Sequence, residues 1–143
     1  MTLSLQEISD RLEIQDLIYN YSAIIDQKRF DDLREVFTED AHIDYSAVGA
    51  PVGGRDEIIT FLQKVMVMFP NHQHLNANAQ ITVNGDTATG RVMCFNPQEI
   101  AMPEDKTHIF MVGLWYIDEY RRTEAGWRIS RRVGEKSYVF NMP

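Results

Sequence analysis

The side chains of this sequence best suited to moving a proton are one carboxylate and one imidazole, Asp26 and His74. Asp26 falls near the end of a predicted helix, in a segment of the chain that spans residues 23–45. A carboxylate in the last turn of a helix is disfavoured by the helix dipole by ~0.3–1 kcal/mol. We expect this acid to be held beside an apolar wall; the alternative is a solvated acid opposite Lys28 and Arg29.

His74 shares one face of a predicted strand with Asn76 and Asn78, and a polar row of this kind must meet either solvent or a polar pocket. Histidine is the natural general base near neutral pH, where it contributes roughly 10²–10⁴ in rate. A carboxylate on its far nitrogen would fix the tautomer and favour the imidazolium that forms on proton abstraction. We therefore predict an Asp26–His74 pair; a surface or structural histidine is the alternative, and the pattern leaves open whether His72 or His74 points inward.

His72 and His74 also form an H-x-H pair, which could suit a metal ion with a carboxylate as third ligand. The other two histidines, His42 and His108, stand in unrelated contexts. An H-x-H pair alone is weak evidence, and we predict no metal and no cofactor. Fingerprints of serine hydrolases, zinc peptidases, P-loop enzymes and dinucleotide-binding proteins are absent from the sequence.

Two tyrosines and several large apolar side chains complete the candidate site. The phenol of Tyr45 or Tyr21 could donate a hydrogen bond to a carbonyl or an oxyanion, although an amphipathic core tyrosine is the alternative for each. Phe95 and Trp115 belong to a group of aromatic and methionine side chains that either form core or line pockets for flat ligands. Tyr45 is therefore a candidate for catalysis with Asp26 and His74, and Tyr21, Asn78, Phe95 and Trp115 are candidates for substrate binding.

The elements that must position these residues begin with helices. Residues 4–7 read Ser-Leu-Gln-Glu, which predicts a capping box at the start of a helix. Apolar residues then recur at helical spacing over 5–27, and again over 30–37 and 58–69. Pro70 ends the last of these. We predict three helices.

The remainder of the chain predicts strands. Alternation over 72–83 places Leu75, Ala77, Ala79, Ile81 and Val83 on one face and the polar row on the other. Asn84-Gly85 is a strong two-residue hairpin signal. The other predicted strands span 42–48, 86–96, 107–122 and 127–140, with a loop at 97–105. This order predicts an α+β fold, a cone-shaped barrel of a curved, mostly antiparallel sheet with three helices on its concave face and a blind cavity at the wide end.

Composition narrows the possible partners. A chain of 143 residues suits one domain, 1–143, and its net charge of -7 argues against nucleic acid and anionic membranes. The single cysteine, Cys94, excludes an internal disulfide, lacks an activating neighbour and fits a reducing cytoplasm. No signal peptide is expected, and no apolar run approaches the ~18 residues of a membrane span.

The combined pattern resembles the SnoaL-like, scytalone dehydratase-like branch of the nuclear transport factor 2-like superfamily. The likeness spans nearly the whole chain, at residues 11–17, Tyr21, 25–30, 36–41, 43–45, Gly54-Arg55, His74, Asn78, 84–88, 116–118 and 126–129. It implies that Asp26 orients the catalytic histidine, that His74 is the base and that Tyr45 helps to polarise a substrate carbonyl. This chain departs from scytalone dehydratase in having Ile25 where that family has a second tyrosine, and Gln98 near the place of a second pocket histidine. The Asp–His pair also resembles that of hexachlorocyclohexane dehydrochlorinase.

The resemblance implies a cofactor-independent lyase or isomerase that acts on a small hydrophobic cyclic substrate, and a homo-oligomer, dimer or trimer. The superfold also hosts other functions. One alternative is a non-catalytic module that binds a hydrophobic metabolite. The other is a structural subunit like the small subunit of ring-hydroxylating dioxygenases.

Overall fold

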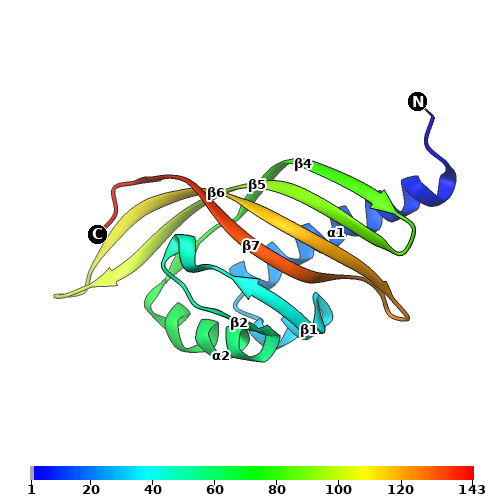
Figure 1. The fold of residues 1–143 in the computed structure, drawn as a ribbon. Helices are drawn as coiled ribbons and strands as arrows, with labels where there is room; N and C mark the ends of the chain where they lie inside the picture. Colours follow the sequence, from blue (N-terminus) through cyan, green and yellow to red (C-terminus); the bar gives the residue numbers. More distant parts are fainter. Residues whose placement is uncertain (1) are drawn as a thin grey trace.

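The computed structural model of the chain describes residues 2–143, which form an α+β fold in which helices cover one face of a curved sheet (Figure 1). The α-helices are α1 (Leu5–Asp26) and α2 (Arg55–Val65). Three short 3-10 helices accompany them: η1 (Phe30–Glu35), η2 (Ser46–Val48) and η3 (Met66–Met68). All three predicted helices are therefore present, the second as η1 and the third as α2 continued by η3.

The sheet contains seven strands: β1 (Phe37–Asp44), β2 (Val52–Gly54), β3 (Asn71–His72), β4 (Leu75–Asn84), β5 (Thr87–Met102), β6 (Lys106–Thr123) and β7 (Gly126–Phe140). Their order is β2-β1-β7-β6-β5-β3, and β4 also pairs with β5. Every pairing is antiparallel except that of β1 with β7, which is parallel. The α+β class and the mostly antiparallel sheet are confirmed, but the sheet stays open and does not close into the predicted barrel.

Helix α1 begins at the predicted cap and delivers Asp26 to the sheet. The hydroxyl oxygen of Ser4 accepts a hydrogen bond from the backbone N–H of Glu7 at 3.1 Å. The reciprocal arm of the predicted capping box is replaced by an ion pair, because the Glu7 carboxylate meets Arg11 at 3.2 Å. Ile14, Ile18, Ile24 and other inward side chains of the helix are buried against the sheet, which fixes the rotation of α1 and so the direction of its last residue.

A β-bulge in β4 changes which side chains face the helices. Ala77 pairs with Met93 and Ala79 with Val92, so Asn78 is an extra residue, and its φ of 31° lies in the left-handed region. Before the bulge, Asn76 faces inward and Leu75 and Ala77 face outward; after it, Ala79, Ile81 and Val83 face inward. The predicted single alternation across 72–83 is therefore wrong for its first half, because one inserted residue reverses the faces.

Two predicted strand boundaries also change. The predicted strand 42–48 begins earlier and ends at Asp44, so Tyr45 lies just beyond β1, at the start of η2. The predicted loop at 97–105 is mostly strand, since β5 continues through Pro97 to Met102 and pairs with β6 over that whole length. The continuation matters for function, because it brings the side chains of Asn96 and Gln98 to the same inner face.

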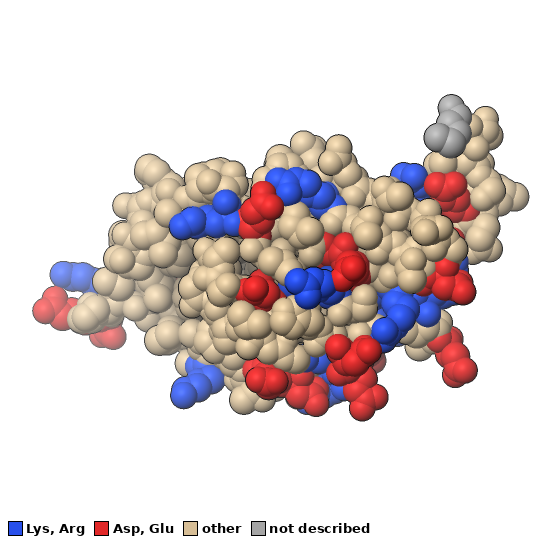
Figure 2. Space-filling model, viewed as in Figure 1, with Lys and Arg blue, Asp and Glu red and all other residues tan. Residues whose placement is uncertain are grey.

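The visible surface carries charges of both signs. In the view of Figure 2, acidic and basic side chains are interspersed, with several carboxylates together along the edge formed by α2 and β1. Within residues 2–143, no helix combines the length and the apolar character that crossing a bilayer requires.

Candidate active site

Asp26 is held at the end of α1 by three hydrogen-bond donors. Its Oδ1 lies 2.7 Å from Nδ1 of His74 and 3.1 Å from Nδ1 of His72, and its Oδ2 accepts the backbone N–H of His74 at 2.9 Å. The side chains of His72 and His74 are 2% and 9% exposed, and that of Asp26 is 23% exposed. These donors offset the unfavourable helix dipole and place the carboxylate between two imidazoles.

The two histidines share one tautomer because of this carboxylate. Burial raises the pKa of Asp26, but the hydrogen bonds from His72 and His74 outweigh it and hold that pKa well below its usual range. An ionised carboxylate can only accept, so each neutral ring must present Nδ1–H to Oδ1. Each neutral ring then has the lone pair on Nε2, which is the arrangement that a general base needs.

Two buried tyrosines form a second polar feature. The hydroxyl oxygens of Tyr21, from α1, and Tyr45 lie 2.6 Å apart. Burial raises the pKa of Tyr21 and raises that of Tyr45 far above its ordinary value, so both phenols are neutral. In such a pair one hydroxyl donates to the other, and the acceptor keeps its own O–H for a ligand.

A buried ion pair lies beneath these rings. Arg132 donates to Asp118 through Nε at 2.8 Å and Nη2 at 2.7 Å, and both side chains are fully buried. The guanidinium carbon lies 4.4 Å from the ring centroid of Tyr21 and 4.0 Å from that of Tyr116. Asp118 also accepts the hydroxyl of Tyr120 at 2.7 Å. This network supports the rings of Tyr21 and Tyr116 from below.

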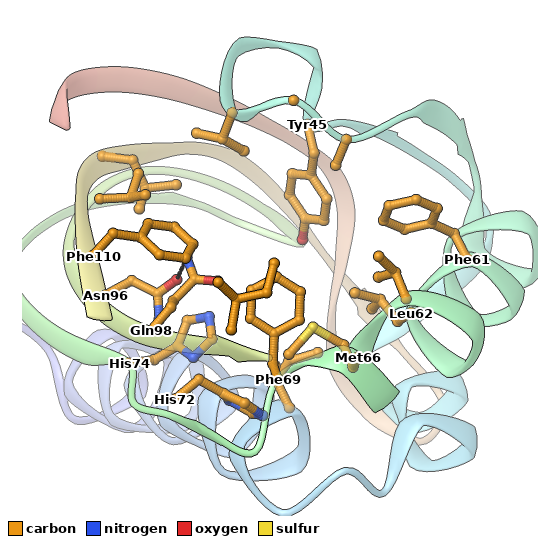
Figure 3. Close-up of a pocket in the computed structure, with 18 of the residues that line it drawn as sticks. Tyr45, Phe61, Leu62, Met66, Phe69, His72, His74, Asn96, Gln98 and Phe110 are labelled. Atoms are coloured by element: carbon orange, nitrogen blue, oxygen red, sulfur yellow. Dashed lines mark hydrogen bonds between the residues drawn. The ribbon is translucent and has the colours of Figure 1, made fainter. Parts of the chain in front are cut away.

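Histidine and tyrosine meet in one cavity of about 380 Å³, shown in Figure 3. Tyr45 points its hydroxyl into the space from one side, and His74 extends into it from the other. Most of the wall is apolar; it is formed by Ile25, Val48, Gly49, Ala50, Phe61, Leu62, Val65, Met66, Phe69, Ile100, Phe110, Val112, Leu114, Tyr116, Met142 and Pro143. A cavity of this volume holds a molecule of two or three fused rings, since about 150 Å³ suffices for benzene.

Two amides complete the cavity wall beside His74. Asn96 donates from Nδ2 to the backbone oxygen of Gln73 at 2.5 Å, and Gln98 donates from Nε2 to Oδ1 of Asn96 at 2.7 Å. Both side chains line the cavity (Figure 3). Neither was among the predicted site residues. Asn96 was the last residue of the predicted strand 86–96, and Gln98 fell in the predicted loop 97–105, although the resemblance placed it near a pocket histidine of scytalone dehydratase. The alternation of Cys94, Asn96, Gln98 and Ile100 was the signal that could have found them.

The structure brings some predicted site residues together and separates others. Asp26 and His74 are in contact, and Tyr21 and Tyr45 line the same cavity as His74. His72 also lines the cavity and contacts Asp26, so both candidate histidines face inward, as two residues spaced i, i+2 along an extended segment do.

Three predicted substrate-binding residues lie outside the cavity, which corrects that assignment. Phe95 pairs with Leu75 and Gly113 on the outer face of the sheet. Trp115 shares that outer face, where the guanidinium carbon of Arg91 lies 4.4 Å from its ring centroid. Asn78 is the exposed extra residue of the bulge. The physical reason is strand parity: Phe95 and Trp115 are one position out of phase with Cys94 and Leu114, which face inward.

Asp26, His72 and His74 could also hold a metal ion. One donor atom from each lies within 4.8 Å of the others, and among the described residues this is the only group of three His, Cys, Asp or Glu side chains that meets this condition. Two imidazoles and a carboxylate match the donor set of several zinc and iron sites. The hydrogen bonds described above satisfy the same three atoms without a metal.

Comparison with known proteins identifies the family. Residues 6–133 match the model of a SnoaL-like domain. An uncharacterized protein of Mycobacterium tuberculosis strain H37Rv is 50% identical over 136 residues, which cover 95% of this chain and 91% of that protein. A protein of Novosphingobium aromaticivorans, provisionally named an aromatic ring hydroxylase, is 33% identical with a TM-score of 0.80, covering 95% of this chain and 92% of that chain.

Two further solved structures share the fold at lower identity. A Novosphingobium aromaticivorans protein, provisionally named a scytalone dehydratase, has a TM-score of 0.84 at 20% identity and covers 96% of this chain and 90% of its own. A type 3 hexachlorocyclohexane dehydrochlorinase of Novosphingobium barchaimii has a TM-score of 0.82 at 18% identity and covers 96% and 93%. Taken with the family match over residues 6–133, these findings establish that the chain belongs to the SnoaL-like domain family, with the scytalone dehydratase-like fold.

Proposed function

We propose that this protein is a cofactor-independent lyase or isomerase that acts on a small, largely apolar ring compound with a carbonyl group. The observation that carries the proposal is the 2.7 Å contact of Asp26 Oδ1 with His74 Nδ1, made by an imidazole that projects into an apolar cavity. Two structural neighbours named for elimination reactions, a dehydratase and a dehydrochlorinase, support the choice of reaction class.

The proposed chemistry starts with His74. Its Nε2 lone pair takes a proton from a carbon next to the substrate carbonyl, and the negative charge of Asp26 stabilises the imidazolium that forms. Tyr21 donates to Tyr45, whose own O–H donates to the carbonyl oxygen as negative charge develops there. The electron pair released from the C–H bond then expels a hydroxide from the neighbouring carbon, which leaves as water with the proton of His74. In an isomerisation, the same proton returns to a different carbon.

The experiment uses 1-tetralone, a neutral two-ring ketone that suits the cavity volume. Nuclear magnetic resonance in D₂O measures the exchange of its α-hydrogens, the first half of the proposed reaction. His74→Ala and Asp26→Asn should each lower the catalysed exchange rate by at least about 100-fold. The exposed His42, in β1, provides the control: His42→Ala should leave the rate unchanged. A rate above about a tenth of wild type in either site variant would exclude the general-base role.

A binding function without catalysis is the second candidate, and the predominance of apolar side chains in the cavity wall favours it. It predicts that 1-tetralone binds and leaves unchanged, with no exchange above the uncatalysed rate. It also predicts that Phe110→Ala weakens binding more than His74→Ala does, because Phe110 supplies more apolar contact area.

A further inference from the structure

We propose that the amide of Gln98 is a specificity subsite that requires a hydrogen-bond donor from the ligand, so the ligand class is a neutral ring compound with a hydroxyl group. The inference deepens the proposed function and rests on the cavity being the ligand site. It concerns recognition, however, and can be tested without turnover. Gln98 lies on the cavity wall beside His74 and Asn96 (Figure 3).

A chain of hydrogen bonds fixes which end of each amide faces where. The backbone oxygen of Gln73 can only accept, so Asn96 must turn its NH₂ group toward it, at 2.5 Å. The Asn96 oxygen then faces Gln98 and accepts from the Gln98 NH₂ group at 2.7 Å. The Gln98 oxygen, Oε1, is left at the free end of this chain.

This chain of hydrogen bonds resists reversal because its first member is a backbone carbonyl, whose residue is itself hydrogen-bonded to β5. Gln73 precedes β4, and its own N–H donates to the oxygen of Pro97 at 3.1 Å, so its carbonyl has a fixed place. Turning Asn96 over would bring two oxygens together there and two NH₂ groups together at Gln98. Asn96 is buried, so water could not readily repair those contacts.

The free oxygen, Gln98 Oε1, is a hydrogen-bond acceptor in a part of the cavity wall with few hydrogen-bond donors. Within residues 2–143, no side chain or backbone N–H donates to Gln98 Oε1. Much of the remaining wall is apolar and includes Phe61, Leu62 and Met66 (Figure 3). A ligand that covers this oxygen without donating a hydrogen bond to it excludes water and leaves the oxygen buried and unsatisfied. Such a ligand should bind more weakly than one that donates to it.

The same wall explains why the ligand should be neutral. In the described part of the chain, no lysine, arginine, aspartate or glutamate lines the cavity, because Asp26 lies behind the histidines and Arg132 lies behind Tyr21. The tyrosine pair can donate an O–H to an acceptor on the ligand, and Gln98 Oε1 can accept a hydrogen bond from a donor on the ligand. Together these groups favour a ring compound that carries an oxygen acceptor and a hydroxyl group.

The test compares 1-naphthol with 1-methoxynaphthalene by isothermal titration calorimetry. The two probes have the same ring system and one oxygen, but only the first can donate a hydrogen bond. Wild-type protein should bind 1-naphthol about tenfold more tightly. Gln98→Met, which keeps the length of the side chain and removes the acceptor, should reduce that ratio to about one. Gln80→Met provides the matched control, since Gln80 pairs with Arg91 on the outer face of the sheet and should keep the tenfold ratio.

Several outcomes would overturn the proposal. If the wild-type protein binds 1-naphthol no more tightly than 1-methoxynaphthalene, the proposal is wrong. This result needs no variant, so it stays decisive even if Gln98→Met fails to fold. A ratio that survives in Gln98→Met but disappears in His74→Ala would mean that the hydroxyl donates to the imidazole instead. The proposed catalytic function fails separately: loss of 1-tetralone exchange with an intact naphthol preference would exclude the reaction and leave the subsite standing.

Discussion

The hydroxyl oxygens of Tyr21 and Tyr45 lie 2.6 Å apart although 24 positions separate the two residues in the chain. One phenol comes from the C-terminal part of α1, and the other comes from the turn that follows β1. Their contact couples the helix to the cavity wall, where the ring of Tyr21 also packs edge-on against that of His74, with 6.2 Å between the ring centroids. The pair is therefore the place where a ligand carbonyl and the helix that carries Asp26 would meet.

The first prediction concerns this pair. Tyr45→Phe should lower kcat for 1-tetralone exchange by about 10²–10³, the usual loss for one oxyanion donor, with little change in KM. Tyr21→Phe should cost less, about tenfold, because the Tyr45 hydroxyl remains in place. Tyr19→Phe is the control, since Tyr19 is 49% exposed on the outer side of α1. Equal losses for Tyr21→Phe and Tyr45→Phe would contradict the assignment of Tyr45 as the donor to substrate.

The second prediction concerns acid stability. Hydrogen bonds from Arg122 lower the pKa of Asp10, burial raises it, and further hydrogen bonds from Trp127 and Gln6 help to bring it from 3.8 to about 2. Because the folded-state pKa lies below the unfolded one, the stabilisation is complete above about pH 4 and is lost as the pH falls toward 2. Urea midpoints of the wild type and Asp10→Asn should therefore differ at pH 7 and converge near pH 2.

Asp16→Asn is the matched control for that experiment. Asp16 lies on the exposed side of the same helix, and the substitution changes the charge equally. Its urea midpoint should follow that of the wild type across the whole range. An Asp10→Asn curve parallel to the wild-type curve between pH 4 and 2 would show that the Asp10–Arg122 contact is not the source of the pH dependence.

The third prediction concerns the buried ion pair beneath the tyrosines. Arg132→Met leaves the buried carboxylate of Asp118 without its charged partner, which should cost about 3–5 kcal/mol in the free energy of unfolding. Arg131→Met changes the same charge at an exposed neighbouring position and should cost less than about 1 kcal/mol. Denaturant titrations measure both. A cost for Arg132→Met similar to that for Arg131→Met would mean that the core accommodates the unpaired acid.

The fourth prediction separates proton transfer from metal catalysis at Asp26, His72 and His74. If hydrogen bonds alone organise these residues, dialysis against a chelator should leave the rate of 1-tetralone exchange unchanged, because no ion takes part. Metal analysis of the dialysed protein confirms that the sample is free of metal. A rate that falls on dialysis and returns with added Zn²⁺ or Fe²⁺ would replace the proposed general-base mechanism by a metal-dependent one.

Sequence periodicity and turn residues were enough to predict the helices and the hairpin at Asn84-Gly85. The contact of Asp26 with His74 was predicted with the help of the family resemblance, because spacing alone left a solvated acid as an alternative. Periodicity failed where the backbone departs from regular strand geometry. The extra residue at Asn78 puts Leu75 and Ala77 on the face opposite to Ile81 and Val83, and neither alternation nor spacing signals such a bulge. Pro97 suggested a loop, but β5 passes through it, so Gln98 was placed in a loop and was not assigned to the site.

The bulge at Asn78 divides β4 into two parts that direct different side chains toward the inner face of the sheet. The part before it supplies Asn76, which donates to the hydroxyl of Ser22 near the candidate site, and the part after it supplies Ile81 and Val83 to the packing around the core. The inserted residue therefore lets a single strand present a polar side chain to the helix in one half and apolar side chains to the core in the other.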